Sequence, residues 1–379
     1  MEQEGNDAAR DLWSQMFERA ATHPGAAVMA PDYDPSEDDA RARAGFATAG
    51  WSEGEIEAML TAGQRRNAAA PSTSPGVNSS AEAFHAVLCD DVEAEMARQG
   101  FKSQCGVARG IEPITGPFAA KAGVIMTGQS IITVGAFTFR FCGLIAKAFH
   151  RTILLEPSYW QSERFTQDGA KLLLRMNMPL ALYWNRIFMS FAMRGTNATV
   201  PFEPSEPTQV ALVEQVARAM ELFIVAHEYG HHHHGHGRQL EANARAEEFE
   251  ADQFALRIGR PIGERDRPPL WHPYLASGSG GVIILKALET LRRFEHALGA
   301  PMPTGVTHPS ADERISRFDS VAVVEPAMYS TLKGFRTASL RVMDAVGSLL
   351  DDFLGVMPER ERARLVAMRR EFWDQLPKL

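Results

Sequence analysis

The pattern of apolar and polar positions predicts a mostly helical chain with a short β-rich segment. Apolar residues recur at helical spacing in many stretches. We expect helices over 1–20, 36–62, 81–100, 208–234, 241–258, 282–298, 310–319, 329–354 and 358–376, and a further helix through Arg140 and Lys147. Ser52 followed by Glu55 is typical of a helix N-terminus. Gly259 and Pro261 mark the end of the helix over 241–258.

One uncharged segment, 122–139, is a candidate for a membrane span. Its length just reaches that of a short membrane helix. Gly123, Gly128 and Gly135 interrupt it, and its β-branched run at 130–134 is typical of a buried strand. Because polar groups are costly in hydrocarbon, we expect a strand here and no stable membrane span.

Composition divides the chain further. Residues 67–80 are rich in Ala, Ser, Pro and Asn and lack apolar periodicity, so they are typical of a linker. Residues 171–193 are rich in large apolar side chains, which we expect in the core, with a substrate groove as the alternative. We predict a helical appendage at 1–66, a linker at 67–80, a main domain at 81–320 and C-terminal helices at 321–379 packed on that domain. The predicted fold class is α+β, mostly helical, with a small sheet beside the helix over 208–234.

Charge and cysteine content narrow the function. The 39 Lys and Arg residues against 47 Asp and Glu residues give a net charge of −8, which argues against nucleic acid as the main partner. Three scattered cysteines, Cys89, Cys105 and Cys142, are too few for a disulfide framework or a cysteine zinc site. The acidic first residues do not resemble a secretory signal, so we expect a cytoplasmic protein.

The clearest chemical motif is His227-Glu228-Tyr229-Gly230-His231. On a helix, residues at i and i+4 project from one face, so both imidazoles can supply corners of a tetrahedral zinc site. Glu228 is adjacent to the first histidine and can act as the general base on a water molecule. The competing interpretation is an exposed helix end that happens to carry histidines.

A third ligand must come from elsewhere in the chain. A metzincin would place a histidine at position 237, which is Gly237 here. Glu248 and Asp252 share a face of the next predicted helix, whereas Glu250 points away. Glu248 can therefore be the third ligand and Asp252 a carboxylate that orients a ligand histidine. A solvated acidic helix face is the alternative.

A run of further histidines follows the motif. His234 lies seven residues after His227 and returns to the same helical face, so it could compete as a ligand. We expect His232, His233, His234 and His236 instead to be exposed at a fraying helix end, where they bind stray metal weakly.

Together these stretches resemble a known group of enzymes. HEYGH followed by E-F-E-A-D at 248–252 resembles the HExxH…ExxxD signature of gluzincins, especially the HtpX-like and CAAX-prenyl-protease-like peptidases. Thr307-His308-Pro309-Ser310 and then Arg314-Ile315 resemble a third segment of those enzymes. The run E-F-E-A-D-x-F-A is also similar to ImmA/IrrE-type regulatory peptidases.

The resemblance implies a zincin-like metallopeptidase domain over 81–320. It implies that His227, His231 and Glu248 bind zinc, that Glu228 activates water and that Asp252 supports a ligand histidine. It also implies that the strand near 131–134 is the edge along which substrate lies.

The segment at 307–315 adds two candidates for stabilising the oxyanion. By the same resemblance, His308 or Arg314 approaches the active site and stabilises the oxyanion, a role that needs a donor aimed at developing charge. A structural turn and a helix cap are the alternatives for these two residues.

The predicted function is zinc-dependent hydrolysis of peptide bonds in a protein or peptide substrate. A second hypothesis is a narrow-specificity regulatory or toxin-like protease that acts on one intracellular protein. A third is a catalytically inactive zincin-fold binding protein, although such a protein has no need of Glu228.

Overall fold

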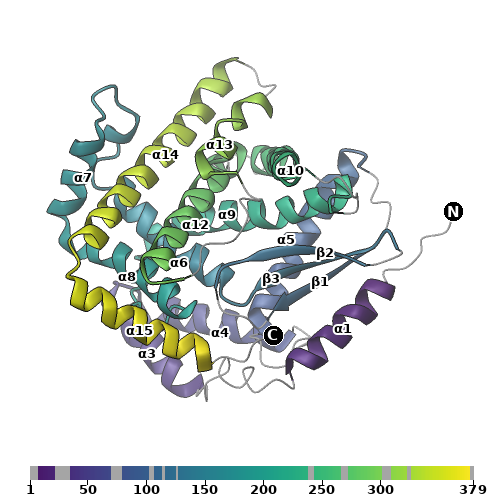
Figure 1. The fold of residues 1–379 in the computed structure, drawn as a ribbon, viewed down its shortest axis with the longest axis horizontal. Helices are drawn as coiled ribbons and strands as arrows, with labels where there is room; N and C mark the ends of the chain where they lie inside the picture. The colour runs from purple at the N-terminus through teal and green to yellow at the C-terminus, as the bar shows by residue number, and fades with distance from the viewer. Residues whose placement is uncertain are drawn as a thin grey trace.

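The computed structural model describes residues 7–21, 35–69, 79–101, 106–112, 116–124, 127–237, 243–265, 272–300, 309–321 and 326–375. Helices dominate and surround a small three-stranded mixed sheet, as the sequence predicts. In Figure 1 the sheet lies to one side of the central helix α9, and helices α7, α8 and α14 lie on the other side.

The N-terminal part is helical. It contains α1 (Asp7–Ala21), α3 (Pro35–Thr48), α4 (Glu53–Ala69) and α5 (Ser79–Arg98). The single helix expected over 36–62 is two helices, because the chain turns at Gly50 with a φ of 88°. Ser52 and Glu55 form the expected cap of α4, with the Ser52 amide donating to the Glu55 carboxylate at 2.8 Å. Much of the predicted linker, 70–78, lies outside the described residues.

The sheet has the order β1-β3-β2 and comprises β1 (Val107–Glu112), β2 (Ala119–Gly123) and β3 (Ser130–Gly135). β3 pairs in parallel with β1 and antiparallel with β2. All six residues of β3 are buried, which confirms a buried strand at this position. The expectation that the strand near 131–134 is the sheet edge is wrong, because β3 is central and β2 is the edge strand on this side.

β1 was not expected, because its sequence V-A-R-G-I-E lacks a β-branched run. Gly110 in this strand leaves room for the ring of Trp13 from α1, since a Cβ at Gly110 would lie 2.1 Å from that ring. Trp13 and Ala9 of α1 form a small separate cluster with Ala108 and Ile131. The first helix is therefore fixed to the sheet by a site that only glycine permits.

The remaining helices follow in chain order. They are α6 (Thr138–Ile153), α7 (Gln167–Met176), α8 (Met178–Arg194), α9 (Pro207–His234), α10 (Ala244–Arg265), α11 (Pro273–Ala276), α12 (Ser279–Ala297), α13 (Ala311–Ile315), α14 (Pro326–Gly355) and α15 (Glu359–Gln375). No helix among the described residues is both long and apolar enough to cross a bilayer. The apolar stretch at 171–193 contributes Leu174, Trp184 and Phe188 to the main core, as expected.

Helix α9 contacts α5, α6, α10, α11, α12 and the two strands β2 and β3. Two glycines allow its closest approaches. A Cβ at Gly230 would lie 2.9 Å from the Cα of Ala251 in α10, and one at Gly280 in α12 would lie 2.3 Å from the backbone of Ala219. These contacts hold the three helices that carry most of the site at short range.

Helix α10 does not end at Gly259 and Pro261 as expected, but continues to Arg265. Pro261 has no N–H, so the carbonyl of Arg257 lacks its helical donor. The side-chain amide of Gln99 donates to that carbonyl at 3.0 Å instead. A contact from outside the helix therefore replaces the missing hydrogen bond, which the local sequence does not reveal.

Candidate metal centre and cleft

The end of α9 presents the HEYGH motif in unbroken helical form. Pro207 occupies the first turn, where its missing N–H costs nothing, and Gly235 ends the helix in the left-handed conformation with a φ of 69°. His227 and Glu228 are buried, and His231 is half-buried. The helix therefore extends through both histidines, which keeps their rings one turn apart on one face.

Three side chains converge to form a group that could hold a metal ion. Nε2 of His227 lies 3.1 Å from Nε2 of His231, and these nitrogens lie 3.5 Å and 3.6 Å from the carboxylate oxygens of Glu248. A tetrahedral zinc site with bonds of about 2.0–2.1 Å separates its ligand atoms by roughly 3.3 Å. The spacing and the donor types of His227, His231 and Glu248 therefore fit a divalent metal such as zinc.

Asp252 and Arg314 contact two of these ligand candidates, His227 and Glu248, and orient their side chains. Nδ1 of His227 lies 3.0 Å from Asp252, and Arg314 donates to the same carboxylate at 2.7 Å and 2.5 Å. Another nitrogen of Arg314 lies 3.1 Å from Glu248. Burial alone would raise the pKa of Asp252, but the hydrogen bonds from Arg314 and His227 outweigh burial and lower that pKa below its ordinary value.

The hydrogen bond between His227 and Asp252 affects the pKa of His227 and determines which ring nitrogen carries the proton. Burial favours the neutral ring, whereas the hydrogen bond to Asp252 raises the pKa of His227, and the net shift is upward. With a carboxylate accepting from Nδ1–H, the lone pair of Nε2 faces His231 and Glu248. Asp252 thus sets which nitrogen of His227 is available to a metal.

His231 is kept neutral by a different environment. Burial and the neighbouring His227 lower its pKa to about 3. Its Nδ1 lies 2.9 Å from Nδ1 of His236, and Nε2 of His236 lies 2.9 Å from Glu250. His231 therefore also has a polar partner on the nitrogen that faces away from Glu248.

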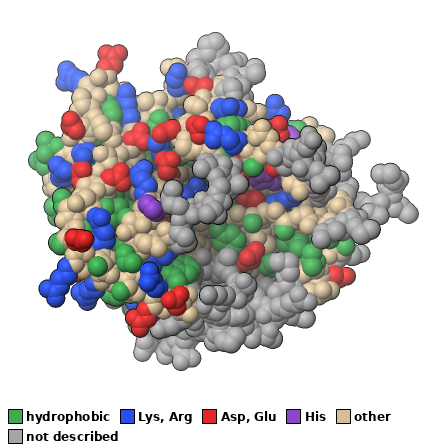
Figure 2. All heavy atoms as spheres, in the orientation of Figure 1, with side chains coloured by type: hydrophobic (Ala, Val, Ile, Leu, Met, Phe, Trp, Pro, Cys, Tyr) green, Lys and Arg blue, Asp and Glu red, His purple; other side chains and the backbone are tan. Residues whose placement is uncertain are grey.

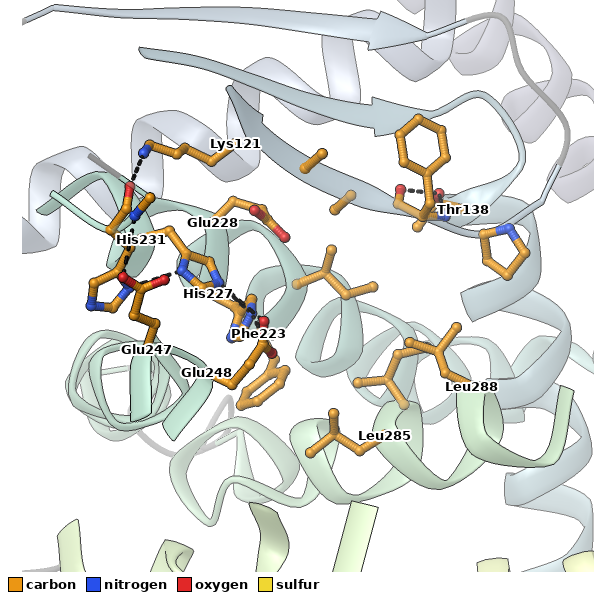
Figure 3. Close-up of a pocket in the computed structure, with 18 of the residues that line it drawn as sticks. Lys121, Thr138, Phe223, His227, Glu228, His231, Glu247, Glu248, Leu285 and Leu288 are labelled. Carbon is orange, nitrogen blue, oxygen red and sulfur yellow. Dashed lines mark hydrogen bonds and ion pairs between the residues drawn. The ribbon is translucent and has the colours of Figure 1, made fainter. Parts of the chain in front are cut away.

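The group opens into a cleft of about 1120 Å³. Edge strand β2 lines one wall and α12 lines the opposite wall, with α9 between them. Figure 3 shows His227, Glu228 and Glu248 at one end of the cavity, and Leu285 and Leu288 at the other end. On the face shown in Figure 2, acidic and basic side chains are intermingled and do not form one basic patch.

Apolar side chains line the cleft along both α9 and α12. They are Phe223 and Ile224 of α9 and Ile284, Leu285, Leu288 and Leu291 of α12. Arg292 and Glu295 extend the lining beyond them. The cleft therefore combines a polar end that suits metal chemistry with an apolar side that excludes water.

The structure thus brings together five of the residues singled out from sequence: His227, His231, Glu248, Asp252 and Arg314. Glu228 lines the cleft beside them. The prediction for His308 lies outside the described residues.

The expectation of an exposed, fraying histidine run is wrong for two of its members. His232 and His236 are buried, and Nδ1 of His232 lies 2.8 Å from the hydroxyl of Ser130 in β3. His234 is exposed, but it belongs to a second group with His236 and Glu250 and not to the first. The run folds back because Gly235 ends the helix and reverses the chain.

Sequence reasoning misplaced His236, which it expected to be exposed, and did not single out Lys121. The Lys121 ammonium, from β2, donates to the backbone carbonyl of His236 at 2.6 Å. This contact joins the edge strand to the end of α9 on the polar side of the cleft. The only local signal was Gly235, whose left-handed conformation at a helix end could have indicated that His236 turns back.

Comparison with known proteins adds one finding. Residues 195–327 match the family model described as Peptidase U49, and this segment contains His227, Glu228, His231, Glu248, Asp252 and Arg314. No curated protein and no solved structure matches the chain.

Proposed function

We propose that this protein is a zinc-dependent metallopeptidase that hydrolyses peptide bonds in the cleft between β2 and α12. The observation that carries the proposal is the convergence of His227, His231 and Glu248 beside Glu228 at one end of an open cleft. The match of residues 195–327 to a family described as a peptidase supports the same reaction class.

His227, His231 and Glu248 would hold the zinc ion. They supply two neutral imidazoles and one carboxylate, which is a ligand set of catalytic zinc sites that leaves a fourth position open. When bound, zinc supplies Lewis acidity, which polarises the scissile carbonyl and lowers the pKa of water.

Glu228 acts as the general base and then as the general acid. Its position next to His227 on α9, facing the cleft, places a carboxylate beside the metal ligands. It accepts a proton from the attacking water and passes that proton to the leaving amine. A protein that only binds a partner has no need of a carboxylate here.

Arg314 has a positioning role in this proposal. Its guanidinium contacts Asp252 and Glu248, and it is 9% exposed. Two carboxylates therefore already occupy its donors, which favours orientation of the metal ligands over donation to an oxyanion. Arg314 also compensates the buried charges of both carboxylates.

The substrate would bind in extended form along β2. Among the described residues this strand pairs only with β3, and Ala119, Ala120 and Lys121 line the cleft. An edge strand can hydrogen-bond an extended peptide as an additional strand. Such binding would bring a backbone carbonyl past the polar end, with side chains directed to the apolar wall of α12.

The test is a hydrolysis assay on a mixture of unstructured proteins and a peptide library. Wild-type chain, metal-depleted chain, zinc-restored chain and the Glu228→Gln variant are compared. We expect activity in the wild type, loss on metal removal, recovery with zinc and no activity in the variant. Activity that survives both metal removal and Glu228→Gln would refute the proposal. Cleavage of one protein alone would identify a narrow-specificity protease.

A further inference from the structure

A second group of possible metal ligands lies at the end of α9. It consists of His234, His236 and Glu250, whose ligand atoms all lie within 4.8 Å of one another. His236 is buried, whereas His234 and Glu250 are exposed to solvent, so an ion can reach the group from outside. The rings of His234 and His236 stack with an angle of 17° between their planes. Two imidazoles and a carboxylate are ligands that zinc and related ions accept.

His236 belongs to both groups through its two nitrogens. Its Nε2 faces Glu250 at 2.9 Å, and its Nδ1 faces Nδ1 of His231 at 2.9 Å. His231 is itself a ligand candidate of the first group through Nε2. A continuous polar chain therefore runs from Glu250 through His236 to His231.

The proton positions in this chain depend on which group is filled. When Nε2 of His231 offers its lone pair to the first group, its neutral ring carries the proton on Nδ1. That N–H donates to Nδ1 of His236, so the proton of His236 lies on Nε2 and donates to Glu250. In this arrangement His236 accepts the Nδ1–H of His231 and orients that ring, as Asp252 does for His227.

An ion bound between His236 and Glu250 needs the opposite arrangement. It takes the lone pair of Nε2 of His236, so the proton of that neutral ring moves to Nδ1. Two N–H groups, from His231 and His236, would then face each other at a distance that requires a donor and an acceptor. One ring must turn, and His231 loses its partner.

We propose that His234, His236 and Glu250 form a second, weaker divalent-metal site whose filling antagonises the first site through the shared contact between His231 and His236. The antagonism rests on the proposed function of the first group, but the existence of the second site does not. Two nearby cations weaken the second site further by charge repulsion: Lys121, which donates to the carbonyl of His236, and Arg257, which acts electrostatically on His234.

The primary test is calorimetric titration of the metal-free, tag-free full chain with Zn²⁺. We expect one tight event and one weaker event. His234→Asn and Glu250→Gln should remove the weaker event and retain the tight one, which Glu250→Gln weakens only slightly. His233→Asn is the matched control, because His233 lies in the same run but outside both groups and stacks on Phe254. It should leave both events unchanged.

The antagonism has its own readout. His227→Asn should remove the tight event and strengthen the remaining one about tenfold, since His231 no longer has to keep its proton on Nδ1. Glu248→Gln should give the same result and guards against a folding defect in the first variant, with thermal unfolding as the check. Equal affinity of the weaker event in the wild type and in both variants would refute the coupling.

Two further outcomes would overturn the second site itself. One is a weaker event that persists in His234→Asn and Glu250→Gln, and the other is one that His233→Asn also removes, which indicates adventitious binding by the whole run. The proposed function fails separately, since a chain without peptidase activity can still show the weaker event and its loss in Glu250→Gln.

Discussion

The two groups of metal-ligand candidates at the junction of α9 and α10 have the same composition but different surroundings. In the first, His227 and Glu248 are buried, and Asp252 and Arg314 contact them from behind. In the second, His234 and Glu250 are exposed. The two groups therefore share their residue types and differ in the burial of their ligands.

The two groups differ in whether buried hydrogen bonds fix the orientation of their ligand side chains. A ligand whose orientation is fixed by buried hydrogen bonds loses little freedom on binding a metal, whereas an exposed side chain must first be ordered. The first group also faces a cleft and has Glu228 beside it. Four predictions test this contrast, in order of decreasing effect.

The largest effect is expected for Glu228→Gln. Removal of a general base lowers the rate by about 10²–10⁴-fold, while the ligands and their supports remain. The catalytic rate should fall by that factor with bound zinc unchanged, as measured by steady-state kinetics and elemental analysis of one preparation. A variant that loses its zinc as well would show that Glu228 acts as a ligand and not as a base.

Arg314→Met tests the support of the first group. It leaves the buried carboxylates of Asp252 and Glu248 without their cation, and loss of one partner of a buried ion pair costs about 3–5 kcal/mol. The free energy of unfolding, measured by urea denaturation of the metal-free chain, should fall by that amount. The control is Arg245→Met, because Arg245 pairs with Glu313 at the surface and such pairs contribute about 0–1 kcal/mol. Equal losses of unfolding free energy in the two variants would contradict the claim that buried contacts stabilise the first group.

Asp252→Asn should weaken zinc binding about 10–100-fold, because the amide is a poorer acceptor for Nδ1–H of His227. Competition with a chromogenic chelator measures the change. Glu250→Gln, which alters the exposed acceptor of the second group, should weaken the tight site less. A larger effect from Glu250→Gln than from Asp252→Asn would reverse the assignment of the better-supported group.

The smallest effect is expected for Gly230→Ala. Its Cβ would lie 2.9 Å from the backbone of Ala251, so α9 and α10 must separate slightly. Overpacking of this kind costs about 1–3 kcal/mol, and thermal unfolding would show a lower midpoint. In the control, Gly334→Ala, the added methyl group meets nothing within 4 Å, so the higher helix propensity of alanine should stabilise α14 by up to about 1 kcal/mol.

The sequence predicted those parts of the molecule that depend on local periodicity. The helix that carries His227 and His231 and the carboxylates one turn apart at Glu248 and Asp252 follow from the spacing of residues on a helix. The strand at 130–134 follows from its β-branched run. These signals lie within a few residues of each other, so a pattern along the chain can reveal them.

Features that depend on distant partners could not be predicted in this way. The order of the sheet places β3 in the centre, and α10 passes Pro261 because Gln99, which directly follows α5, replaces a hydrogen bond. His236 is buried because the chain reverses at Gly235 and Lys121 of β2 holds its carbonyl. The contacts of Gln99 and Lys121 each span more than a hundred residues, and the strand order depends on pairing between strands, which an apolar period along the chain does not encode.

The most direct test of the central claim is the zinc content of the purified, tag-free chain after dialysis against metal-free buffer. The wild type, Glu248→Gln and Glu247→Gln are compared, because Glu247 is the adjacent carboxylate in the same cleft but outside the ligand group. The account predicts about one retained zinc ion per chain in the wild type and in Glu247→Gln, and its loss in Glu248→Gln. Equal zinc in all three, or none in the wild type after reconstitution, would contradict the claim that His227, His231 and Glu248 form the metal centre.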